Sequence, residues 1–179
     1  QGFHPTGVLG AFGATAAAGV CLQLQPKQLA SALGIVGSMT SGIIEYLAEG
    51  TWTKRMHPGW AAASGLKAAL MARNGFLGPR TVFEGEHGFF KAFADHSIKQ
   101  DLSVLDNWGG SWHFDQVAFK PFACGTMTQP FIDCAISARG KVDTKDVEKI
   151  VAHIGEGTVH RSWEPLDEKR RPSTQNGAQ

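Results

Sequence analysis

Cysteine is scarce in this sequence, and its three cysteines lie far apart. Cys21, Cys124 and Cys134 are too widely spaced for a zinc knuckle or an iron–sulfur ligand run, and an odd number leaves at least one thiol unpaired. We therefore expect a reducing compartment, the cytoplasm.

An excess of charge of either sign is also missing. Lysine and arginine together number 17 and aspartate and glutamate 16, so the formal net charge is +1. Without a global electrostatic field, nothing predicts binding to nucleic acid or to an anionic membrane surface. Any recognition by charge must therefore be local.

The sequence has no long run of strongly hydrophobic residues. Residues 5–26 carry no formal charge and are long enough to span a bilayer, but Ala, Gly, Thr and Gln dominate them. We predict a helix buried on nearly all sides and no membrane partner. Small residues would let neighbouring helices approach it closely, namely Gly7, Gly10, Gly13 and Ala17.

Motifs of nucleotide, cofactor and metal sites are missing as well. The glycines of the first helix follow G-x-x-G-x-x-G with no strand before them, and the sequence holds no G-x-S-x-G, P-loop or H-E-x-x-H. We predict no cofactor and no metal. The sequence starts without Met or a basic n-region, so we expect a piece of a longer protein.

Cationic and imidazole side chains do stand beside structure-breaking residues. In GTWTKRMHPGWAAA, residues 50–63, the Pro58-Gly59 pair predicts that Lys54, Arg55 and His57 lie in a loop and that a helix opens at residue 59 or 60. A cationic loop beside the N–H groups of a helix start suits carboxylates or phosphates. The alternative is ordinary solvated surface.

Two more candidates come from the ends of predicted elements. His4 precedes the first helix, whose dipole would disfavour its protonated form; helix capping or plain exposure is the alternative. Lys120 lies between Phe119 and Pro121, so it is either paired with an acid or open to an anionic ligand. Lysines that neutralise carboxylates and histidines that move a proton next to a carbonyl suit elimination, decarboxylation or epimerisation.

The remaining pattern predicts a mainly α chain. Residues 95–113 turn polar and irregular and are the candidate domain boundary. From Asp143 on, an amphipathic helix competes with a capped turn and a strand, and we favour the strand. Helices are expected at 26–36, 43–48, 60–74, 88–94 and 128–138, short strands at 114–122 and 149–154, and a loop or disordered end from 164.

Three blocks of the sequence resemble the MmgE/PrpD family, in the order in which the family has them. They are GFHPTGVLGAFGATAAAGVCLQL (2–24), TKRMHPGWAAASGLKAALMARNGFLGP (53–79) with VFEGEHGFF behind it, and VAFKPFACGTMTQPFIDCA (117–135). The family includes 2-methylcitrate dehydratase, cis-aconitate decarboxylase and iminodisuccinate epimerase. The resemblance spans nearly the whole chain.

The resemblance implies a fold and a site. Residues 1–113 would be part of a large all-helical domain, and residues 114–179 would begin a smaller α+β lid, with the pocket between the two domains of a homodimer's subunit. His4 matches the family's pocket His and Lys54 its pocket Lys, while His57 is the His that follows this Lys and Lys120 is the Lys at the domain junction. His4 and His57 are thus the expected catalytic residues, and Lys54 and Lys120 the expected substrate-binding residues.

Two departures from the family bear on function. Relatives commonly carry His where this chain has Gly125 or Gln129, and a Gln side chain cannot shuttle a proton near neutral pH. The family's upstream helical region, which supplies an Asp, a Thr and a His to the pocket, is expected to lie outside this chain, as is the rest of the lid.

Two functions are therefore expected, from different classes. The first is a cofactor-independent lyase or isomerase that acts on a di- or tricarboxylic acid by acid–base chemistry. The alternative is a truncated or degenerate relative that binds an acid or dimerises without turnover.

Overall fold

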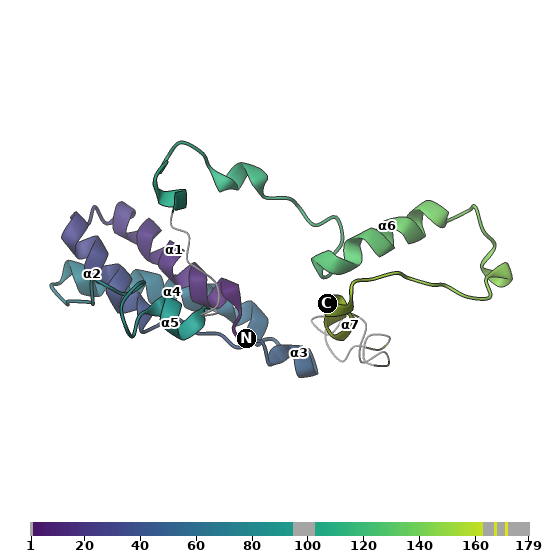
Figure 1. The fold of residues 1–179 in the computed structure, drawn as a ribbon, viewed down its shortest axis with the longest axis horizontal. Helices are drawn as coiled ribbons and strands as arrows, with labels where there is room; N and C mark the ends of the chain where they lie inside the picture. Colours follow the sequence, from purple (N-terminus) through teal and green to yellow (C-terminus); the bar gives the residue numbers. More distant parts are fainter. Residues whose placement is uncertain (1, 95–102, 163–166, 168–170, 172–179) are drawn as a thin grey trace. The chain divides into compact units, whose positions relative to one another are not determined.

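The computed structural model describes residues 2–94, 103–162, 167 and 171. These residues form helical elements with almost no β-structure (Figure 1). The chain divides into two units, Gln1–Leu102 and Ser103–Gln179. The mainly α class is confirmed, whereas the predicted boundary at residue 113 and the start of a lid domain at 114 stay predictions. Within the described ranges, no helix combines the length and apolarity needed to cross a bilayer.

Three helices form the body of the first unit, and each packs against the other two. They are α1 (Pro5–Cys21), α2 (Pro26–Gly37) and α4 (Thr53–Arg73). Proline begins α1 and α2, where its missing N–H costs nothing because the first turn has no partner for it. The N–H of Gln25 donates to Oε1 of Gln28 at 3.0 Å and so caps α2. The helix predicted at 26–36 is confirmed.

Two shorter helices complete this unit. The predicted helix at 43–48 is reduced to α3 (Tyr46–Glu49), which ends at Gly50 with a left-handed φ of 68°. The aromatic segment at 88–94 forms α5 (Phe89–Phe93), as predicted. The ring of Phe89 lies 5.0 Å from that of Phe12 of α1, centroid to centroid, and the ring of Phe83, which precedes α5, lies 4.9 Å from the same Phe12 ring. These contacts close one end of the core.

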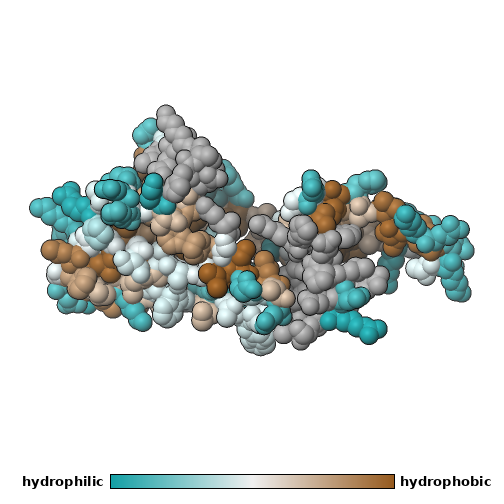
Figure 2. Space-filling view, turned by 60° about the horizontal axis from the view of Figure 1, so that its bottom comes forward, coloured by the Kyte–Doolittle hydropathy of each residue, from teal (hydrophilic) through white to brown (hydrophobic). Residues whose placement is uncertain are grey.

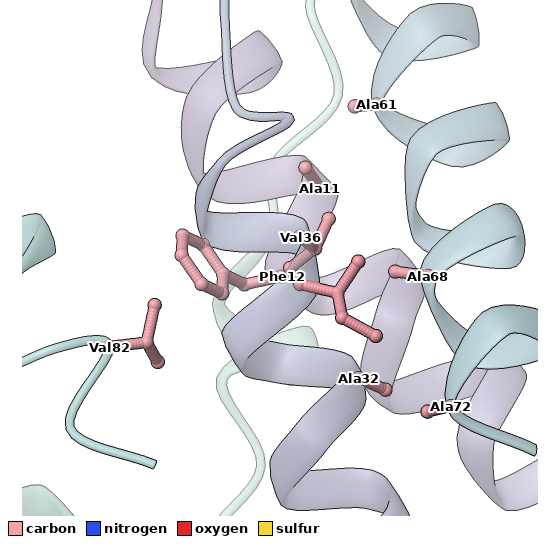
Figure 3. Close-up of a cluster of buried hydrophobic side chains, with 9 residues drawn as sticks. Ala11, Phe12, Ala32, Val36, Ala61, Ala68, Ala72 and Val82 are labelled. Atoms are coloured by element: carbon pink, nitrogen blue, oxygen red, sulfur yellow. The ribbon is translucent and has the colours of Figure 1, made fainter. Parts of the chain in front are cut away.

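Alanine dominates the core where the three long helices cross (Figure 3). Small side chains let helix axes approach closely, and the resulting dense contacts replace the burial that larger residues would supply. Phe12 and Val82 fill the wider space beside α2 (Figure 3). The buried cluster consists of Ala11, Phe12, Ala32, Ile35, Val36, Ala61, Ala68, Ala72 and Val82.

The prediction that α1 is buried on nearly all sides is wrong for this chain. Leu9 is 57% exposed and Val20 is 73% exposed, because only one face of α1 meets α2 and α4. Gly7 and Gly10 lie at close contacts, as predicted, whereas a Cβ on Gly13 would meet nothing within 4 Å. Hydrophobic residues, in brown, therefore reach the molecular surface (Figure 2).

The prediction of a loop at Lys54, Arg55 and His57 is also wrong. Helix α4 begins at Thr53 and runs through Pro58, which lies inside it. Pro58 has no N–H to donate to the carbonyl of Lys54, but this position is so near the helix start that the following turns continue. The helix ends at Asn74, and Gly75 takes a left-handed φ of 89°.

The second unit consists of short elements. Helix α6 (Gln129–Ala138) confirms the helix predicted at 128–138, and Asp143 accepts from the N–H of Lys145 at 3.0 Å to cap η4, as the capped turn predicted. The other elements are η1 (Ser103–Leu105), η2 (His113–Gln116), η3 (Thr126–Thr128), η4 (Thr144–Asp146) and α7 (Glu156–Ser162).

The strands predicted at 114–122 and 149–154 do not form. Residues 114–116 lie in η2, and residues 117–120 and 147–155 are irregular. An alternating pattern becomes a strand only when a neighbouring strand pairs with it and a core covers one face. Neither is present in the described part of this unit, where the Phe119 side chain is 99% exposed. The end predicted to be loop, 164–179, lies almost entirely outside the described residues.

The crossing of α1 and α4 supports a matched pair of substitutions. A Cβ on Gly65 would lie 2.6 Å from Cβ of Ala14 and 2.6 Å from the backbone N of Thr15, so Gly65→Ala must push the helices apart. We expect it to lower the free energy of unfolding by about 1–3 kcal/mol. Gly13 lies one residue from that contact but on an exposed face of α1. Gly13→Ala should therefore raise the free energy of unfolding by about 0.5–1 kcal/mol. Urea unfolding followed by circular dichroism measures both, and equal effects would contradict the packing argument.

Candidate acid–base site

Two histidines share a hydrogen bond in the first unit. Nδ1 of His4 lies 2.8 Å from Nδ1 of His57. One of these atoms must carry a proton and the other a lone pair, because two protonated Nδ1 atoms would repel and two bare ones could not bond. The pair therefore holds a single proton between its facing atoms. Both predicted catalytic residues lie together, although they are far apart in sequence.

Backbone pairing brings His4 to this position. Phe3 and Ile43 form an isolated antiparallel bridge. On either side of it, the N–H of His4 donates to the carbonyl of Gly42 at 2.8 Å and the N–H of Ile44 donates to the carbonyl of Gly2 at 2.9 Å. His4 is then the N-cap residue of α1, as its place before the predicted helix indicated, but its side chain makes no capping bond. The imidazole is thus left to bond to His57.

Glycines make room for the buried ring of His57. A Cβ on Gly42 would lie 3.2 Å from Nδ1 of His57, and Gly42 has a φ of 126°, where residues with a Cβ are strained. On α1, a Cβ on Gly7 would collide with the carbonyl oxygen of Ser41 and lie 3.5 Å from Cβ of His57. His57 is only 5% exposed as a result. Ser41 and Gly42 therefore line the site.

Tyr46 and Lys54 lie against the histidine pair. The ring of Tyr46 is 5.6 Å from that of His4 and 5.7 Å from that of His57, edge to face in both cases. Nζ of Lys54 lies 5.9 Å from the centroid of the Tyr46 ring. Because Lys54 and His57 are three residues apart in α4, they occupy neighbouring positions on one face of the helix. The sequence pattern missed Tyr46, and its only signal was that it is the chain's single tyrosine.

The surroundings of His4 favour its neutral form. Burial lowers the pKa of His4 below 6.5, and the neighbouring His57 and the Lys54 ammonium lower it further. A lowered pKa agrees with the prediction that the protonated form of His4 is disfavoured. Its first cause, however, is burial, which the sequence pattern did not indicate. Burial also raises the pKa of Tyr46 above 10.0, so its hydroxyl stays protonated at neutral pH. His4 is accordingly suited to accept a proton.

A hollow of about 610 Å³ opens beside the buried side of this cluster. His57 and Tyr46 form part of its wall, whereas His4 and Lys54 do not. Its rim includes the carboxylates of Glu45 and Glu49, and its lining is mostly apolar. The hollow is therefore a poor place for a polyanion, and His4 and Lys54 are the groups that suit one. Among the described residues, no cluster of three or more His, Cys, Asp or Glu could hold a metal ion.

The fourth predicted site residue, Lys120, lies in the second unit. Its side chain is exposed, although Phe119 and Pro121 flank it in the sequence. Whether it joins the other three residues stays a prediction. Nearby, Gln129 donates to the carbonyl of Phe122 at 3.0 Å and accepts from its N–H at 3.1 Å. Gln129 thus ties down the loop that follows Lys120.

The low pKa of His4 makes a prediction about stability. Above a pH of about 6.5 the histidine is neutral in both the folded and unfolded chain; below it the unfolded chain binds a proton that the folded chain refuses. The contribution of His4 to the free energy of unfolding should therefore be fully present above pH 6.5. It should be lost as the pH falls through the pKa that His4 has in the folded chain. In His4→Asn the amide can still bond to His57 but cannot titrate, so this pH dependence should flatten.

The measurement is chemical unfolding at a series of pH values between about 5 and 8, which brackets the ordinary histidine pKa. His87→Asn is the matched control, since it removes an exposed imidazole from the same unit and leaves the pair intact. The control should keep the wild-type slope. A wild-type slope in His4→Asn would contradict the assignment.

Comparison with known proteins agrees with the resemblance noted in the sequence. The model of the MmgE/PrpD N-terminal domain matches residues 1–101, which include His4, Lys54 and His57. The human protein called cis-aconitate decarboxylase is 37% identical over 76% of this chain and 28% of its own length. The mouse protein of that name is 32% identical over 97% of this chain and 37% of its own length, and one from Aspergillus terreus is 28% identical over 79% and 30%.

The chain thus spans less than two-fifths of the length of these relatives. The family match covers more than half of the chain, and its helical architecture agrees with an N-terminal domain of that kind. This chain belongs to the MmgE/PrpD family.

Proposed function

We propose that this chain supplies acid–base and carboxylate-binding residues of a cofactor-independent lyase or isomerase that acts on a di- or tricarboxylic acid. The observation that carries the proposal is the 2.8 Å bond between His4 and His57, with the Lys54 ammonium close enough to lower the pKa of His4. The relatives' name makes cis-aconitate the first substrate to test. 2-Methylcitrate is the second, because the family that the sequence resembles includes 2-methylcitrate dehydratase.

Lys54 would bind one carboxylate of the acid. It lies in the first turn of α4, where helix N–H groups and the positive end of the helix dipole add to its charge. Its Nζ lies 5.9 Å from the centroid of the Tyr46 ring, which also contacts the ring of His4. Lys120 would bind a second carboxylate.

His4 would move the proton. In an elimination or epimerisation, the neutral imidazole takes a proton from the carbon next to a carboxylate, and the remaining electron pair spreads into that carboxylate, which Lys54 stabilises. In a decarboxylation, the bond to the leaving carboxylate breaks, CO₂ departs with neutral charge, and the electron pair left on carbon takes a proton from the imidazolium form. His57 shares its Nδ1 contact with His4 in both cases and so fixes which nitrogen of His4 is free to react.

A second candidate is a non-catalytic relative that binds an acid or assembles with a copy of itself. The acidic rim formed by Glu45 and Glu49 beside His57 favours it, because two carboxylates oppose a bound polyanion. The replacement of the family His by Gly125 or Gln129 points the same way. The two candidates differ in turnover, and homodimer formation is compatible with either.

Binding at Lys54 can be tested with a matched pair of lysines on α4. Nζ of Lys54 lies over the Tyr46 ring, and Nζ of Lys67 lies 5.7 Å from the centroid of the Trp60 ring. We expect Lys54→Met to weaken binding of cis-aconitate about tenfold or more, since a charge-assisted contact is worth about 1.5–3 kcal/mol. Lys67→Met removes the same charge from the same helix and should leave binding unchanged.

The measurement is an NMR titration of the chain with cis-aconitate and with 2-methylcitrate, in which the ligand signals also report conversion. Equal weakening in the two lysine variants would place the effect in net charge and not at Lys54. Binding without conversion would favour the non-catalytic candidate, and no binding at all would overturn the proposed function for this chain.

A further inference from the structure

Tyr46 is the one buried polar group at the site to which the proposed chemistry gives no part. It is the only tyrosine of the sequence and is 7% exposed. It comes from α3, a helix of four residues that contributes no other residue to the buried core. Burying a purely hydrophobic side chain there would cost less free energy, since a tyrosine also has to accommodate its hydroxyl.

The ring of Tyr46 contacts all three candidate residues of the first unit. Its edge-to-face contacts to His4 and His57 join two rings that are themselves 5.0 Å apart, so the three rings form a closed triangle. The ammonium of Lys54 lies over the ring that both imidazoles touch. In a cation–π contact the ammonium is attracted to the ring face, while edge-to-face contacts favour fixed ring angles.

We propose that Tyr46 is a positioning residue, whose aromatic ring holds the His4–His57 pair and the Lys54 ammonium in one arrangement. This proposal rests on the proposed function, in which His4 moves the proton and Lys54 binds a carboxylate. The ring acts through these residues: it sets the distance between a cation and the imidazole that must stay neutral. Tyr46 also lines the neighbouring hollow, together with His57.

The pKa of His4 reports the charges around its ring and is therefore the quantity to measure. The titratable and charged groups against it are His57 and Lys54 from α4 and Tyr46 from α3. If the ring were lost, the ammonium of Lys54 would no longer be held at the ring face, and water would reach His4. Hydration of the imidazole favours its protonated form, so the pKa of His4 would rise toward its ordinary value.

The test compares Tyr46→Phe with Tyr46→Leu in the full chain, with the His4 ring titrated by NMR at its Cε1 proton. Phenylalanine keeps the ring face, so the titration midpoint of His4 should stay at its wild-type value. Leucine fills the space without a π-system, so the midpoint should move upward. A wild-type midpoint in a folded Tyr46→Leu protein would overturn the proposal, and so would an equal shift in both variants.

One measurement needs no variant and so does not depend on Tyr46→Leu folding. In the wild-type chain, the methylene protons of Lys54 nearest the ammonium should resonate upfield, because the face of an aromatic ring shields them, and should show nuclear Overhauser effects to the Tyr46 ring. The corresponding protons of Lys91, which is exposed on α5, are the internal control. Equal chemical shifts for these methylene protons of Lys54 and Lys91 would overturn the proposal.

The two proposals fail in different ways. Titration of these variants with cis-aconitate reports the proposed function, whereas the His4 midpoint reports positioning in the absence of ligand. If Tyr46→Leu shifts the midpoint but no variant or wild-type chain binds the acid, the positioning role holds and the proposed function falls. If the wild-type chain binds the acid and neither the midpoint nor the affinity changes in Tyr46→Leu, the positioning role falls alone.

Discussion

The hydrogen bond between His4 and His57 is the contact on which the site depends. It can form only while one Nδ1 atom is bare, so the fold has to keep at least one of two adjacent imidazoles unprotonated there. Burial and the nearby Lys54 ammonium do this for His4. Three segments must also meet: the residues before α1, the 42–44 segment that pairs with them, and the first turns of α4. The bond therefore reports the correct assembly of the unit.

The packing of the long helices makes this meeting possible. Alanine and glycine at the crossing of α1 and α4 bring the helices close, and Gly7 and Gly42 then leave space for the His57 ring between two backbones. A Cβ at Gly42 would press on the His57 ring, whereas a Cβ at Gly7 would collide first with the carbonyl oxygen of Ser41. The glycines of the N-terminal helix thus serve helix packing and the placement of an imidazole at once, and no nucleotide contact is needed to explain them.

The sequence predicted the helices well and the site only in part. Periodicity and end signals such as Pro26 and Gly75 located α1, α2, α4 and α6 because these signals are local. Pro58 led to a wrong prediction of where α4 begins, since a proline near a helix N-terminus can lie inside the helix as well as before it. His4, Lys54 and His57 were identified by residue type, but their contact depends on pairing between segments distant in sequence. Tyr46 was missed because a lone aromatic residue carries no pattern. The two predicted strands do not form because an alternating sequence pattern does not supply a neighbouring strand to pair with.

The distribution of proton-transfer groups between the units constrains any reaction that the chain could support. In the described part of the second unit, Gln129 is fully engaged in holding the loop after Lys120, and an amide cannot take a proton near neutral pH. Among the candidate residues of the first unit, acid–base capacity therefore rests on the His4–His57 pair. A reaction that needs one group to cycle a proton, as epimerisation and decarboxylation do in their simplest forms, fits such a pair better than one that needs two independent acids. Dehydration needs a second donor for the leaving hydroxyl, and it would have to come from His57 through the bond that the pair already shares or from outside this chain.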